Sequence, residues 1–167
     1  MHNLNFEVLP NSSVNHLLVY NLSVWDGSPV SPQYRILLPG ATIEQVVPIT
    51  DTYQTIDKDS VGYSTDELPD GIWTIVLRTG ADPYQTLTKQ FLRINAFWEQ
   101  YKSLLLKLEH SEFSVREDKI IKGLLYDIDI LISSAQACAE TGLVSKATEL
   151  YEKAQKILSR VTNQANV

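Results

Sequence analysis

Apolar and polar residues alternate with a period of two over the first part of the chain. Leu4, Phe6 and Val8, for example, alternate with Asn3, Asn5 and Glu7. Segments with this spacing, or a weaker form of it, are 4–8, 18–24, 34–38, 43–49, 52–56, 72–79 and 84–95. Every second side chain of such a segment lies on one face of a strand. Seven short segments separated by proline and glycine predict an antiparallel, immunoglobulin- or fibronectin-like β-sandwich over residues 1–95.

The strand over 72–79 has the clearest start, because the turn-forming run Pro69-Asp70-Gly71 precedes it. Apolar residues occur on both of its faces, which is typical of a central strand. The residues that we expect inside the sandwich are Tyr20, Leu22, Ile36, Val47, Trp73 and Ile75.

The period changes at Ala96 from two to that of an α-helix. The spacing predicts three helices, over about 96–109, 115–141 and 144–161, so that residues 96–167 form an α-helical domain and the fold class is α+β. Ser114 and Glu117 fit a capping box at the start of the second helix. Gly142 suits a left-handed C-cap at its end, which would let the third helix fold back against the second.

Two apolar stripes predict the contact between these last two helices. The first stripe is Ile121, Leu124, Ile128, Leu131, Ala135 and Cys138, and the second is Leu143, Ala147, Leu150, Ala154, Ile157 and Val161. Leu125 and Ile132 lie on an adjoining face of the second helix, which the first helix is expected to cover only in part. Together with Trp98 at the strand-to-helix junction, they are the candidate partner-contact residues.

Charge divides the chain near residue 89, a few residues before the hydrophobic pattern changes. The formal charge is −6 over 167 residues; counting along the chain, residues 1–88 carry −7 and residues 89–167 carry +1. An acidic first part argues against nucleic-acid binding, which favours a basic stripe. We expect no membrane span, because no apolar run approaches about 18 residues. We also expect no secretory signal, because residues 1–5 form neither a basic nor an apolar segment. One cysteine, Cys138, suits a reducing compartment.

The sequence offers little catalytic or metal-binding chemistry. His2, His16 and His110 are far apart, and with a single cysteine we expect no structural metal site. The run 57–62 begins like a calcium loop but has Val61 and Leu68 where oxygen ligands are needed. We expect no cofactor, no metal and no catalytic residues, and therefore a protein that is not an enzyme.

The three tryptophans could instead form a ligand platform. Trp25, Trp73 and Trp98 would serve a carbohydrate-binding module only if they were exposed. Aromatic residues in strands are more often part of a core, and we assign Trp73 and Trp25 to the core.

The helical segment resembles known helix pairs. Residues 133–158, with Gly142 between two helices and Ala147, Leu150 and Ala154 in the second, look like one tetratricopeptide helix pair. A solenoid needs about three repeats, so the resemblance implies a single packed hairpin. The layout as a whole, a short sandwich with the strand entry Leu-Pro-Asp-Gly-Ile-Trp-Thr-Ile (68–75) leading into helices, resembles small ring and connector proteins of crAss-like tailed phages.

That resemblance implies a structural virion subunit at the portal–tail junction. It would form a homo-oligomeric ring, dock to portal or tail proteins, and reside in the virion after assembly in the host cytoplasm. The alternative is an intracellular adaptor or binding module that recognises a protein partner as a monomer.

Overall fold

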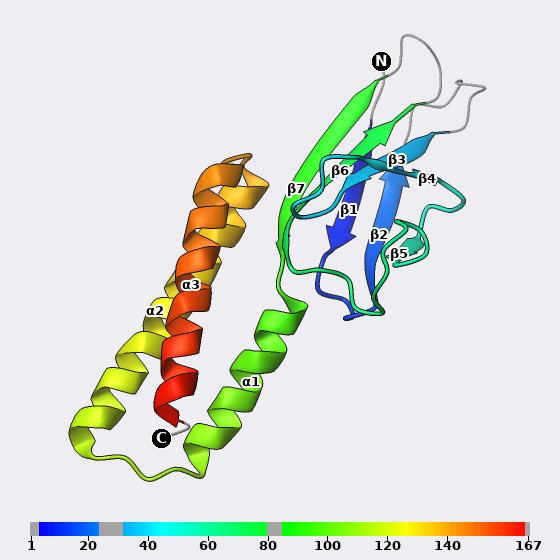
Figure 1. Cartoon of the computed structure of the whole chain (residues 1–167). Helices are drawn as coiled ribbons and strands as arrows, with labels where there is room; N and C mark the ends of the chain where they lie inside the picture. Colours follow the sequence, from blue (N-terminus) through cyan, green and yellow to red (C-terminus); the bar gives the residue numbers. More distant parts are fainter. Residues whose placement is uncertain (1–3, 24–31, 80–84, 166–167) are drawn as a thin grey trace. The chain divides into compact units, whose positions relative to one another are not determined.

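The computed structural model describes residues 4–23, 32–79 and 85–165. The chain divides into two compact units, which we call the sandwich unit (residues 1–93) and the helical unit (residues 94–167). The expected boundary between 95 and 96 lies two residues later. Two antiparallel sheets followed by three helices confirm the predicted α+β fold (Figure 1).

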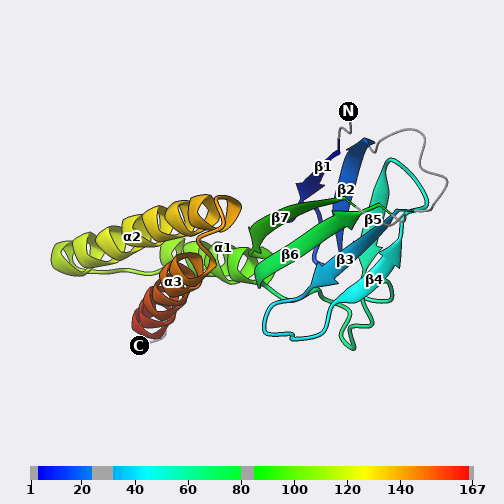
Figure 2. The same ribbon diagram turned by 90° about the horizontal axis from the view of Figure 1, so that it is seen from above.

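The sandwich unit contains seven strands in its described part (Figure 2). They are β1 (Asn5–Leu9), β2 (His16–Ser23), β3 (Gln33–Leu37), β4 (Gln45–Pro48), β5 (Gln54–Asp57), β6 (Gly71–Arg78) and β7 (Thr86–Arg93). One sheet has the order β1-β2-β5 and the other β4-β3-β6-β7, and all pairs are antiparallel. The chain therefore changes sheet between β2 and β3, between β4 and β5, and between β5 and β6, as sandwich folds with Greek-key connections do.

The core of this unit forms around β6, as its two-sided apolarity predicts. Trp73 and Ile75 are fully buried, as is Ile36 on β3, and Val47 on β4 is buried as well. The Trp73 ring stacks on Phe91 with 6.3 Å between centroids, and its Nε1 donates a hydrogen bond of 2.9 Å to the carbonyl of Pro69. The indole thus buries a large apolar area without leaving its one donor unpaired.

The prediction of which face of β2 is buried is wrong for the first half of the strand. Leu17 and Val19 are buried instead of Tyr20, whereas Leu22 packs against the core as expected. The register between β1 and β2 shifts at this point, and Asn21 has a φ of 53°. A bulge adds one residue to the strand and so reverses the alternation of its side chains. Odd-numbered residues before the bulge and even-numbered residues after it can therefore face the same core. Val24, Trp25 and the turn after them lie outside the described residues.

The helical unit consists of α1 (Asn95–Glu109), α2 (Val115–Glu140) and α3 (Val144–Ala165), with α2 and α3 antiparallel (Figure 1). The Oγ of Ser114 accepts a hydrogen bond of 3.2 Å from the N–H of Glu117, as the capping box predicts, while the Glu117 carboxylate accepts from the Ser114 hydroxyl. Gly142 ends α2 with a φ of 86°. The N–H groups of Leu143 and Gly142 bond to the carbonyls of Cys138 and Ala139, which is a Schellman motif.

The buried face of α2 is turned relative to the expected stripe. Its buried residues are Ile121, Ile128, Ile132, Ala135 and Ala139, and those of α3 are Ala147, Tyr151, Ala154, Leu158 and Val161. Leu124, Leu131 and Cys138 are only half-buried, and Leu143 is exposed. α2 carries two adjacent apolar stripes, and either could form the contact with α3. The buried alanines of the two helices allow α3 to pack closely against the stripe that contains Ile132. Among the described residues, no helix combines the length and apolar character that a membrane crossing requires.

Candidate functional site

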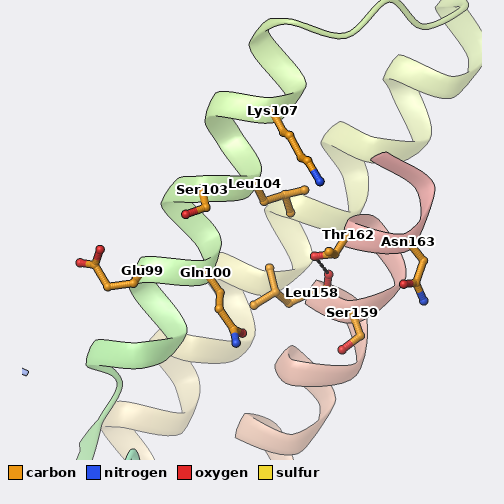
Figure 3. A pocket seen from close by; sticks show the side chains of 9 residues that line it. All are labelled: Glu99, Gln100, Ser103, Leu104, Lys107, Leu158, Ser159, Thr162 and Asn163. Carbon is orange, nitrogen blue, oxygen red and sulfur yellow. Dashed lines mark hydrogen bonds between the residues drawn. The ribbon is translucent and has the colours of Figure 1, made fainter. Parts of the chain in front are cut away.

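A groove lies between α1 and α3 of the helical unit. It has a volume of about 590 Å³. Leu104 of α1 and Leu158 of α3 lie between the two helices, with polar side chains around them (Figure 3). Those polar residues are Glu99, Gln100, Ser103, Lys107, Ser159, Thr162 and Asn163.

The side chains that line this groove suit contact with a polypeptide. Thr162 donates its hydroxyl hydrogen to the carbonyl of Leu158 at 2.8 Å, so this hydroxyl is already used within α3 (Figure 3). The remaining amide and hydroxyl groups can donate and accept hydrogen bonds, as a peptide backbone would require. Neither a nucleophile with an adjacent base nor a pair of facing carboxylates lines the groove.

The solvent-facing side of α2 is a second candidate surface, and it differs in character from that of α3. The exposed residues of α3 are almost all charged or polar, including the ion pair between Glu149 and Lys153 at 3.2 Å. On α2, Tyr126 is 66% exposed and Ile130 is 46% exposed, one helical turn apart, and Ile120 is also exposed. Two large apolar side chains one turn apart on an otherwise mostly polar outer face form a small apolar patch, which is a candidate contact surface.

The three residues predicted to contact a partner lie in different environments. Ile132 is 2% exposed and belongs to the interior of the helical unit, so it is not accessible to a partner. Leu125 is half-buried. Trp98 is also half-buried, and its ring meets the edges of Phe97 and Tyr101 on α1 at centroid distances of 5.8 and 5.2 Å. Among the accessible apolar side chains of α2 are Tyr126, next in sequence to Leu125, and Ile130, two residues before Ile132.

Tyr101 links α1 to α2 within this unit. Its hydroxyl donates to the Asp129 carboxylate at 3.3 Å. Burial, followed by the charge of that carboxylate, raises the pKa of the Tyr101 phenol. Asp129 thus has a structural partner, whereas the neighbouring Asp127 faces solvent.

The calcium-like run in the sandwich unit is organised by its own hydrogen bonds. The Oδ1 of Asp57 accepts from both the backbone N–H and the hydroxyl of Ser60, each at 2.9 Å, and these bonds lower the pKa of Asp57. Lys58 pairs with Asp66 at 2.8 Å, and Val61 is buried. Across the described ranges, no group of three or more histidine, cysteine, aspartate or glutamate residues could hold a metal ion.

One fully buried cation was missed by the sequence reasoning. Arg93, the last residue of β7, donates hydrogen bonds to the carbonyl oxygens of Pro10, Ser13 and His16, which belong to the turn between β1 and β2 and to the start of β2. Burial lowers its pKa to about 10, and the nearby charge of Asp70 partly offsets this effect. Since both terminal nitrogens of its guanidinium donate to backbone carbonyls, Arg93 holds the sandwich together.

Comparisons of the chain with protein-family models, curated proteins and solved structures found no match.

Proposed function

We propose that this chain is a non-enzymatic structural subunit of a phage virion, a ring or connector component at the portal–tail junction. It would act by assembling with copies of itself and by docking to portal or tail proteins. The virion role is supported by the resemblance in layout, a short sandwich leading directly into helices, and the assembly role by the surface of the helical unit.

The observation that carries the assembly part is the exposed apolar side of α2. Tyr126 and Ile130 sit together on the outer side of a helix whose inner side already forms the core with α3. On α1, Leu106 is exposed as well. Apolar patches of this kind on a small protein mark contact surfaces, because leaving them in water is unfavourable.

A second candidate function, an adaptor that binds a protein partner as a monomer, is favoured by the groove between α1 and α3. Leu104 and Leu158 between the helices and a rim of amides and hydroxyls suit an extended peptide. This adaptor would use the groove, whereas the virion subunit would use the outer side of α2.

The test is to measure the mass of the full chain in solution, alone and with portal and tail proteins encoded near it. The virion subunit forms assemblies of more than one copy or a stable complex with one of these proteins. A chain that stays monomeric at high concentration and binds none of them contradicts the virion role and leaves the adaptor.

A further inference from the structure

Eight exposed residues of α2 follow a heptad spacing along its outer side. They are Arg116, Lys119, Gly123, Tyr126, Ile130, Ser133, Ala137 and Glu140, which we call the α2 seam. Their separations alternate between three and four, the spacing that keeps one stripe facing a partner helix in a coiled coil. The spacing is also symmetric about position 128, so that each residue of the first half has a counterpart in the second.

We propose that the α2 seam pairs with the α2 seam of a second copy, antiparallel and about a two-fold axis near residue 128. The counterpart of Tyr126 is then Ile130 of the second copy, and that of Gly123 is Ser133. This inference rests on the proposed function in one respect, that the chain assembles with itself. It adds the surface, the partner and the direction of the pair. A two-fold pair uses the same surface of both copies and closes at two, so it is a contact between pairs of subunits and not the head-to-tail contact that closes a ring.

The chemistry of each layer supports this register. Tyr126 against Ile130 forms an apolar centre, and two such layers lie next to each other because of the symmetry. Gly123 against Ser133 places two small residues opposite each other, which lets the helix backbones approach closely. In the next layer, the methylene stem of Lys119 can cover Ala137 while its ammonium stays in water.

The outermost layers bring opposite charges together. Arg116 meets Glu140 of the second copy at both ends of a seam about 36 Å long. In the described part of the chain, neither residue makes an ion pair. Within a single copy both charges are poorly placed, because a cation at a helix N-terminus and an anion at its C-terminus oppose the helix dipole. An antiparallel neighbour supplies each with an opposite charge.

Asp127 provides a register-specific test. It flanks the seam one residue from the two-fold axis, so the Asp127 side chains of both copies lie close to each other across the axis, where their charges repel. Asp127→Asn is therefore expected to tighten the dimer by about 2- to 5-fold. In a different register, or without self-pairing, the substitution has no effect on association.

The affinity of the full chain for itself would be measured by sedimentation equilibrium. Ile130→Asp puts a carboxylate into both central layers and should weaken the dimer at least about 100-fold. Arg116→Glu should weaken it about 10-fold, and adding Glu140→Arg should restore it to within about 3-fold. Both charge changes favour the helix dipole of the single copy, so a loss of dimer cannot be ascribed to unfolding.

Disulfide trapping tests the direction of the pair. In a Cys138→Ala background, Gly123→Cys chains are mixed with Ser133→Cys chains under mild oxidation. The proposed register gives a linked dimer that contains one chain of each kind, and neither preparation links by itself. Links within either preparation alone, or none in the mixture, overturn the antiparallel register.

The outcomes separate this inference from the proposed function. If the chain forms assemblies that Ile130→Asp and Arg116→Glu leave unchanged, the α2 seam is overturned while self-assembly stands. A chain that is monomeric alone but binds a portal or tail protein also overturns the seam and keeps the virion role. A chain that dimerises through the seam but binds no virion protein supports the seam and contradicts the docking.

Discussion

Arg93 and Pro10 are 83 residues apart in the sequence, yet the guanidinium of Arg93 donates a hydrogen bond to the carbonyl oxygen of Pro10. Pro10 follows β1 of one sheet, and Arg93 ends β7 of the other. The same side chain also bonds to the carbonyls of Ser13 and His16. One buried arginine therefore joins the end of the last strand to the turn between the first two.

Replacing this arginine should destabilise the sandwich. Arg93→Met keeps the apolar stem but takes the charged donor away from the carbonyls of Pro10 and Ser13, and we expect a loss of about 3 kcal/mol in the free energy of unfolding. Arg93→Lys keeps the charge but gathers its donors on one nitrogen, so an intermediate loss is expected. Urea denaturation measures both, and an Arg93→Met variant as stable as the parent would show that these bonds contribute little.

Gly71 lies at the start of β6, where no side chain fits. Its φ is 131°, and a Cβ added there would lie 2.8 Å from the Cβ of Pro39. Gly71→Ala should therefore cost at least about 2 kcal/mol, from backbone strain together with the clash. Gly40→Ala is the matched control, since Gly40 also has a positive φ but open space around it; it should cost only about 1 kcal/mol. Equal losses in thermal unfolding would mean that the contact with Pro39 does not matter.

Ile128 and Ile130 test the two sides of α2 with the same substitution. Ile128 is fully buried, so Ile128→Asp puts a carboxylate into the core and should unfold the helical unit. Ile130→Asp lies on the outer side and should leave helicity nearly unchanged while it abolishes association. Circular dichroism and sedimentation compare the pair; equal losses of helicity would show that the buried face of α2 is assigned incorrectly.

Tyr34 predicts how the sandwich responds to alkaline pH. Burial raises the pKa of Tyr34 to about 12 from its ordinary value of 10.0. The folded chain thus keeps this proton where the unfolded chain loses it, and its contribution to stability is complete below pH 10 and falls as the pH rises towards 12. Urea unfolding between pH 9 and 11 should show a smaller fall for Tyr34→Phe than for the parent. Parallel curves for the two proteins would contradict this assignment.

The elements of the fold could be predicted from the sequence because local signals are strong here. Alternation and turn residues place the strands, and Ser114 and Gly142 mark the ends of α2. The inward face of β2 could not be predicted, since the bulge at Asn21 is set by pairing with β1 and reverses the alternation. A bulge leaves no signal in a pattern that reads as continuous.

The sequence predicts that α2 carries an apolar contact surface, but it does not predict which residues form that surface. The two-sided apolarity of α2 is evident in the sequence, and it led to Leu125 and Ile132. In the folded helical unit Ile132 is buried while Tyr126 and Ile130 are exposed, and choosing between two adjacent apolar stripes needs the partner helix. The symmetric spacing of the α2 seam is present in the sequence as well, but only exposure distinguishes it from the other stripes.

The central claim, that this chain works by assembling, is tested most directly by its mass in solution. We would measure the full chain by sedimentation equilibrium at micromolar concentrations, next to the Ile130→Asp variant. The account predicts assemblies of at least twice the chain mass of 18.8 kDa for the parent and weakened association for the variant. A parent chain that sediments as an 18.8 kDa monomer at every concentration, and that gains no mass with portal or tail proteins, would contradict it.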